Sequence, residues 1–168
     1  MEVIRKLQGA YGLTLILMMY LYPPTIVGLL LLRGALEKLG REELGRAVRL
    51  SIAAFLLSVP LYVAKIFLGI SGWAKVLGIT PIETSPLVYN GVHVVFLFLQ
   101  ALSLYYLYKT LDVLAEMTEQ TILKTAGLIL ILAIPMHFVS IKVYFAATLT
   151  GLVLILFGLE NAKEAVAW

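Results

Sequence analysis

The sequence predicts an all-α protein, a polytopic transmembrane helical bundle of about five spans in one integral membrane domain over residues 1–168. Two observations predict it. The chain is 61% hydrophobic and only 14% charged, whereas a soluble domain carries roughly a quarter charged residues. The apolar residues also gather into runs of about 20, the length that crosses a bilayer. Such a chain leaves no room for a separate soluble catalytic domain.

The first predicted span, residues 11–32, contains the stretch LYPPT. Pro24 cannot donate to the helix ladder, and its ring crowds the preceding turn. Dividing the segment at the prolines would give arms of roughly a dozen residues, which are too short to cross about 30 Å of hydrocarbon. We therefore expect one span kinked at the pair Pro23 and Pro24, with a re-entrant loop as the alternative.

The remaining spans follow from apolar runs separated by turn residues. In the second, Lys65 lies near the far end, where a long side chain can reach the headgroups. Ser85 and Pro86 form an N-cap and first-turn pair that begins the third span, and Lys142 marks a tight turn before the last. The predicted limits of these spans are 47–70, 87–108, 121–139 and 144–159.

The distribution of Lys and Arg predicts the orientation, because cytoplasmic loops carry the excess. One side of the predicted bundle collects Arg33, Lys38, Arg41, Arg46, Arg49, Lys109, Lys124 and Lys163. The other side collects Arg5, Lys6, Lys65, Lys75 and Lys142. We therefore predict a multi-pass protein of the cell membrane with the N-terminus outside and the C-terminus in the cytoplasm.

The composition also bears on function. The chain has no cysteine, which excludes disulfides, iron–sulfur clusters and the attachment of c-type haem. Its net charge of +3 comes from loop residues, which indicates a lipid bilayer and not a nucleic acid as the partner. Apart from Arg49 and Lys124 near span ends, Lys65 is the one charged residue of the predicted spans, whereas pumps and transporters usually carry carboxylates there. This pattern argues against an enzyme.

The two histidines, His93 and His137, are the candidate ligands. At 1.5 Å per residue, each lies about 5 to 10 Å below the outer boundary of its predicted span. Two imidazoles on adjacent antiparallel helices could bind a b-type haem. Its walls would come from Gly91, Phe96 and Phe138, and its propionates would meet Lys142 or Lys75. The alternative is that both histidines are interfacial polar residues without a ligand. No metal site is predicted, because zinc needs three or four ligands and only Glu83 is near.

Small residues at helical spacing occur on the last span, where Ala147 and Gly151 form a small-x-x-x-small face. Such a face lets helices approach closely. It predicts packing within the bundle or, alternatively, association with a membrane-protein partner or a second copy.

Two stretches carry a resemblance to a known group. The opening KLQGAYGLTLILMMYLYPPTIVGLLLLRGALEKLGREELGRAV, and LKTAGLILILAI followed by a final apolar helix, resemble small archaeal multi-spanning membrane proteins of unknown function. The likeness covers most of the chain through compositional motifs. It implies an archaeal cell membrane and no activity, so no functional residue is carried over.

Three functions follow from these observations. The leading hypothesis is a non-enzymatic integral membrane protein that serves as a structural or accessory subunit of a membrane assembly, because its spans lack the charges that transport and catalysis require. The first alternative is a b-type haem-binding anchor of a redox complex that uses His93 and His137. The second is a small-molecule carrier that uses the kink at Pro23 and Pro24.

Overall fold

The computed structural model describes residues 2–20, 22–71 and 73–165, without the side chains of residues 20, 137–139, 141 and 163–165. Within these residues the fold is all-α, as the sequence predicts, and contains no strand. Its seven helices are α1 (Glu2–Tyr20), α2 (Thr25–Glu37), α3 (Glu42–Phe67), α4 (Trp73–Val76), α5 (Pro86–Thr118), α6 (Thr121–Val139) and α7 (Ile141–Ala165).

Three segments in the described part of the chain are long and apolar enough to cross a membrane. They are α3, α5 and the Lys142–Ala162 part of α7, while α6 contributes a shorter apolar segment over Thr121–Met136. These segments make the chain a candidate membrane protein with fewer long spans than the five that the sequence predicts.

Most predicted limits agree with the helices. The predicted span 121–139 coincides with α6, and the spans 87–108 and 144–159 lie inside α5 and α7. The expected cap of α5 is present, since Ser85 Oγ accepts a hydrogen bond from the Val88 backbone N–H at 3.4 Å. The predicted span 47–70 overruns the end of α3 at Phe67, because Gly69 takes a φ of +70° and turns the chain.

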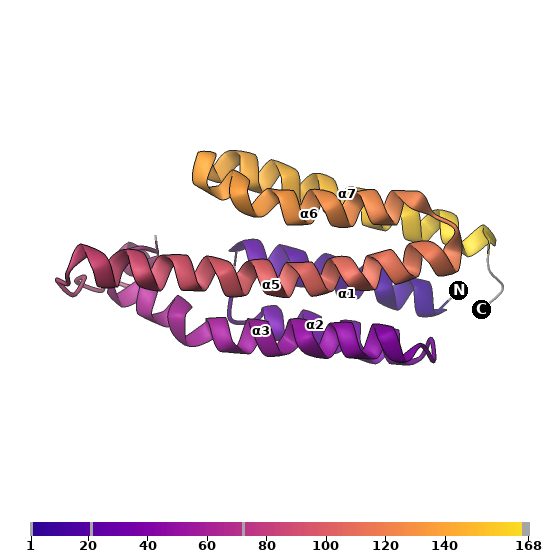
Figure 1. The fold of residues 1–168 in the computed structure, drawn as a ribbon, viewed down its shortest axis with the longest axis horizontal. Helices are drawn as coiled ribbons and strands as arrows, with labels where there is room; N and C mark the ends of the chain where they lie inside the picture. The colour runs from indigo at the N-terminus through magenta and orange to yellow at the C-terminus, as the bar shows by residue number, and fades with distance from the viewer. Residues whose placement is uncertain (1, 21, 72, 166–168) are drawn as a thin grey trace.

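The predicted single span over residues 11–32 is instead a helical hairpin. α1 and α2 are separated by a turn in which the Thr25 N–H donates to the Tyr22 carbonyl at 3.1 Å, and α2 packs back against α1 (Figure 1). Gly28 permits this packing, because a Cβ at its position would lie 2.7 Å from the backbone Cα of Thr14. A single kinked span would be needed only if each arm had to cross the lipid alone. In the structure the two arms bury their apolar faces against each other and against the bundle.

The six longer helices form a closed bundle. In the order α1, α2, α3, α5, α6 and α7, each helix packs against the next, and α7 packs against α1. Buried hydroxyls join helices that are far apart in the sequence. Tyr11 OH and Thr110 Oγ1 lie 2.5 Å apart between α1 and α5, and Ser51 Oγ and Ser103 Oγ lie 3.0 Å apart between α3 and α5. In apolar surroundings such pairs satisfy each other's hydrogen-bonding groups.

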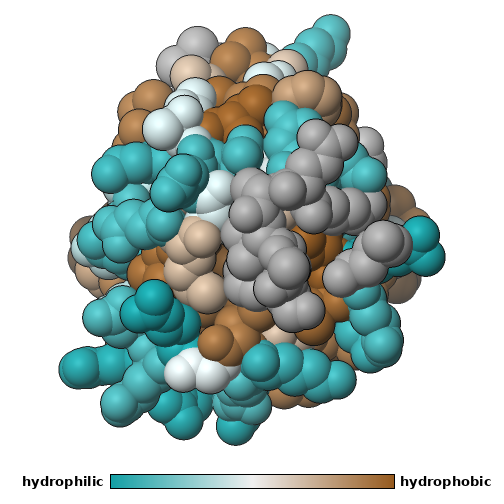
Figure 2. Space-filling view, turned by 90° about the vertical axis from the view of Figure 1, so that its right-hand side faces the viewer, coloured by the Kyte–Doolittle hydropathy of each residue, from teal (hydrophilic) through white to brown (hydrophobic). Residues whose placement is uncertain are grey.

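Both ends of the described chain lie at the same end of the bundle (Figure 1). Gln8 Nε2 of α1 donates to the Leu156 carbonyl at 3.1 Å and to Glu160 at 2.9 Å, so the start of α1 lies beside the last turns of α7. The sequence predicted opposite sides for the two termini. The hairpin changes that arrangement, because it brings Arg5 and Lys6 to the end that already holds most of the Lys and Arg residues. Hydrophilic side chains surround this end (Figure 2).

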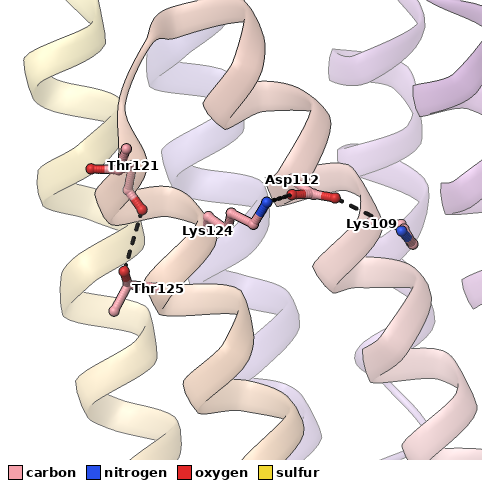
Figure 3. A network of polar contacts seen from close by, with 5 residues as sticks. All are labelled: Lys109, Asp112, Thr121, Lys124 and Thr125. Atoms are coloured by element: carbon pink, nitrogen blue, oxygen red, sulfur yellow. Dashed lines mark hydrogen bonds and ion pairs between the residues drawn. The ribbon is translucent and has the colours of Figure 1, made fainter.

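The opposite end of the bundle is stepped. α5 has 33 residues and α6 has 19, which correspond to about 50 Å and 28 Å of helix. Near the Lys- and Arg-rich end the two helices are joined by Asp112 and Lys124, 3.1 Å apart (Figure 3). Counted from this pair, α6 ends well before the start of α5. The last turns of α3, the first turns of α5 and α4 therefore project beyond the α1–α2 and α6–α7 turns (Figure 1).

Candidate functional site

A cavity of about 510 Å³ lies at this step. It is lined by side chains from the end of α1, the α1–α2 turn, the last turns of α3, the α3–α4 loop, α4, the first half of α5 and the start of α7. Its size falls in the range of small-molecule sites, roughly 300–1,000 Å³. The cavity exists because the α1–α2 and α6–α7 hairpins end level with the middle part of α5. The α3–α5 pair continues beyond the turns of these hairpins and forms a wall of the cavity.

Lys65 is the charged residue of this cavity. Its side chain is only 7% exposed, and its Nζ lies 4.0 Å from the centre of the Phe96 ring. Among the side chains that the structure describes, no carboxylate forms an ion pair with Lys65. Buried charges are normally paired, because removal from water is costly. Lys65 therefore differs from an ordinary structural lysine.

The segment after α3 explains why Lys65 does not extend to the surface as the sequence analysis expected. The N–H groups of Ile70 and Ser71 both donate to the Lys65 carbonyl, at 2.9 and 3.2 Å, and the chain then turns back. Further along, the Ile82 N–H donates to the Phe67 carbonyl at 2.9 Å. The loop that carries α4 thus folds over the end of α3, and the lysine side chain lies inside it.

Aromatic rings form one wall of the cavity. The ring centre of Tyr22 lies 4.9 Å from that of Phe55, 5.0 Å from that of Tyr62 and 5.1 Å from that of Phe96. The Tyr22 hydroxyl is satisfied by Ser58 Oγ at 2.7 Å. This cluster holds the α1–α2 turn against α3 and α5, since aromatic pairs at these separations are favourable.

Two further polar side chains line the cavity from α5 and α7. Gln100 Nε2 donates to the Tyr144 hydroxyl at 3.2 Å, and the two side chains are 7% and 5% exposed. The amide and the tyrosine hydroxyls are neutral hydrogen-bonding groups that line the same cavity as the one ammonium group. The site therefore combines an apolar, aromatic lining with a few polar groups, as ligand pockets do.

The structure places one of the two predicted haem ligands in this cavity. His93 lines it from α5, whereas the side chain of His137, and that of the predicted wall residue Phe138, lie outside the described side chains. Lys75 on α4 and Lys142 at the start of α7 are exposed. Haem binding by His93 and His137 therefore stays a prediction. In the described part of the chain, no three His, Asp or Glu residues gather as metal ligands would.

The small residues of α7 face the inside of the bundle at Gly151. A Cβ there would lie 2.8 Å from Leu130 and 3.4 Å from the Ala126 carbonyl, both on α6. Gly151 is buried and Ala147 half-buried. The close approach at Gly151 is therefore between α6 and α7, and association with a partner or a second copy through this face stays a prediction.

The other end of the bundle carries ion pairs. Asp112 on α5 lies 3.1 Å from Lys124 on α6 and 3.8 Å from Lys109 (Figure 3). On α1, Glu2 pairs with Lys6, and the hydrogen bond from this lysine holds the pKa of the Glu2 carboxyl below its ordinary value. The Glu2–Lys6 pair is exposed and contributes little stability, whereas Asp112 is only 17% exposed and joins α5 to α6.

Comparison with protein-family models, with curated proteins and with solved structures finds no match for this chain. The resemblance to small archaeal membrane proteins therefore stays a prediction.

Two lining residues were already named in the sequence, but for other roles: Lys65 was expected to reach the headgroups, and His93 to bind haem or to lie at the membrane interface. The sequence did not indicate Tyr22, Gln100 and Tyr144 as members of this site, because they come from the α1–α2 turn, α5 and α7 and meet only through the fold. The signal that pointed to the site was the ammonium group, since a charge within an apolar span is costly and typically functional.

Proposed function

We propose that this protein is a non-enzymatic helical membrane protein that binds a small amphipathic molecule in the cavity beside Lys65. The observation that supports this is a lysine, 7% exposed and without a described carboxylate partner, that lines an aromatic cavity of about 510 Å³. A charge kept in such a place at a cost to stability indicates a ligand-binding role. Of the functions that the sequence suggests, the small-molecule carrier is the one this geometry favours.

We also propose an orientation that replaces the predicted one. The end that holds both termini carries most of the Lys and Arg residues, while Lys65, Lys75 and Lys142 lie at the other end. The positive-inside rule then places both termini in the cytoplasm. The cavity would open at the outer face of the membrane, where α3 and α5 project beyond the hairpins.

The position of Trp73 provides the test of binding. It lines the cavity, and the only other tryptophan is Trp168, so the variant Trp168→Phe leaves Trp73 as the sole tryptophan. The purified variant would be placed in phosphatidylcholine nanodiscs and titrated with bromine-labelled medium-chain compounds that are neutral, anionic or cationic. Binding in the cavity predicts saturable quenching of Trp73 by at least one of them.

The control is a tryptophan outside the cavity. In the variant with Trp73→Phe and Trp168→Phe, a new tryptophan at Leu132, which is 55% exposed on α6, reports only partition of the compounds into lipid. If every compound quenches Trp73 in the same linear, non-saturating way as the tryptophan at this position, the proposed function is wrong.

A further inference from the structure

We propose that the cavity selects an amphiphile with a single negative charge, whose head is held by the Lys65 ammonium and whose apolar body lies along the aromatic wall. This inference rests on the proposed function and names the class of ligand. The head would be a fatty-acid-type carboxylate or the phosphodiester of a bilayer lipid, because both present one negative charge on an apolar body.

The charges around the cavity favour an anion. Its titratable lining residues are Lys65, His93 and the tyrosines, and it contains no Asp or Glu in the described part of the chain. In the stretch of the sequence from residue 51 to residue 105, Glu83 is the one acidic residue, and it is exposed on the loop before α5. A positive charge in a cavity whose walls have a low dielectric constant attracts anions more strongly than the same charge in water. A cationic ligand would be repelled.

The surroundings of the ammonium group favour one negative charge over two. Lys65 Nζ has three N–H donors, and the contact that the structure gives it is the face of the Phe96 ring at 4.0 Å. Gln100 and Tyr144, which line the same cavity, are neutral and bond to each other. A monoanion would complete the coordination of one ammonium group, whereas a dianion would bring an unpaired charge into an apolar site.

The lining also accounts for the apolar body of the ligand. Met18 and Met19 from α1 line the cavity beside Tyr22 and Phe96, and methionine side chains adapt to flexible apolar molecules. An ammonium group above such a wall matches an amphiphile with a charged head and an apolar chain.

The experiment uses the single-tryptophan protein in phosphatidylcholine nanodiscs with bromine-labelled decanoate, decanol and decyltrimethylammonium. We expect decanoate to quench Trp73 at concentrations at least 10-fold below those needed for decanol, and the cation to give no saturation. The variant Lys65→Gln should weaken decanoate binding about 10- to 100-fold, as expected for loss of a charged hydrogen bond. It should leave decanol binding unchanged, and Lys65→Arg should retain the preference for decanoate.

A matched control is Lys75→Gln, which removes an exposed lysine of α4 outside the cavity lining and should leave the preference for decanoate intact. Decanol binding to Lys65→Gln serves as its folding control. If that variant does not fold, the comparison of the three compounds on the protein with Lys65 still decides the question. Adding phosphatidylglycerol to the nanodiscs distinguishes the sources: displacement of labelled decanoate indicates the bilayer lipid, and no displacement indicates a free carboxylate.

Two failures are distinguishable. If none of the three compounds gives saturable quenching, the proposed function falls and this inference falls with it. If decanol or the cation binds as tightly as decanoate, or Lys65→Gln keeps the preference for decanoate, the cavity binds small molecules but the inferred anion selectivity is wrong.

Discussion

Replacing Gly28 by alanine is expected to separate the α1–α2 hairpin, because the space for a methyl group is taken by the backbone of the facing helix. A Cβ at position 28 would lie 2.6 Å from Thr14 Oγ1 and 2.7 Å from both Cα and N of Thr14. The Thr14 hydroxyl donates to the Ala10 carbonyl at 2.7 Å and is fully buried. Neither it nor the backbone can move without shifting α1.

The magnitude follows from comparison with Gly34 on the same helix, where an added Cβ meets no atom within 4 Å. Both substitutions gain about 1 kcal/mol of helix propensity, which cancels in the comparison. Carbon atoms pack best at about 3.5 to 4.0 Å, so the contact at Gly28 is about 1 Å too short. Overpacking of this kind costs about 1–3 kcal/mol. Because the atoms at Gly28 belong to the backbone, we expect a difference near 3 kcal/mol.

The assay is reversible unfolding of both variants in mixed micelles with increasing dodecyl sulfate, followed by circular dichroism. We expect Gly34→Ala to unfold at or above the midpoint of the unsubstituted protein and Gly28→Ala to unfold well below it. If the two variants unfold at the same midpoint, α1 and α2 do not pack at Gly28, and the hairpin is refuted in favour of a kinked span.

Three further predictions concern topology, buried hydrogen bonding and haem. The chain has no cysteine, so a membrane-impermeant maleimide added to intact cells should label Thr84→Cys and spare Glu2→Cys, whereas labelling of both would support the N-terminus outside. Tyr11→Phe removes the 2.5 Å contact with Thr110 and should lower the free energy of unfolding by about 1–2 kcal/mol; an unchanged midpoint would show that the pair contributes nothing. The haem hypothesis predicts a Soret band after haem supplementation that disappears in His93→Ala, and a protein without the band would dispose of it.

Much of the helical content was predictable because local patterns determine it. The serine and proline that begin α5 cap it as predicted, and α6 has the predicted limits. The error at residues 11–32 had a different origin. A proline pair shows where a helix ladder breaks, but the angle of the following helix depends on what it packs against, and the decisive contact joins Gly28 to Thr14.

The candidate site was less predictable than the helices. A lysine near a span end normally extends to the headgroups, and nothing near Lys65 in the sequence indicates that the loop after α3 folds back over it. The lining residues of the cavity come from five helices, the α1–α2 turn and the α3–α4 loop, between Met18 and Phe145, so sequence spacing could not predict that they meet.

The sequence by itself determined that the chain is helical and apolar, because composition and helix signals act residue by residue along the chain. Only the tertiary structure decided that both ends of the described chain lie at one end of the bundle and that a buried ammonium group faces a cavity. The physical reason is that each outcome depends on contacts between distant segments: the close approach of two backbones at a glycine, and two hairpins shorter than the helices beside them.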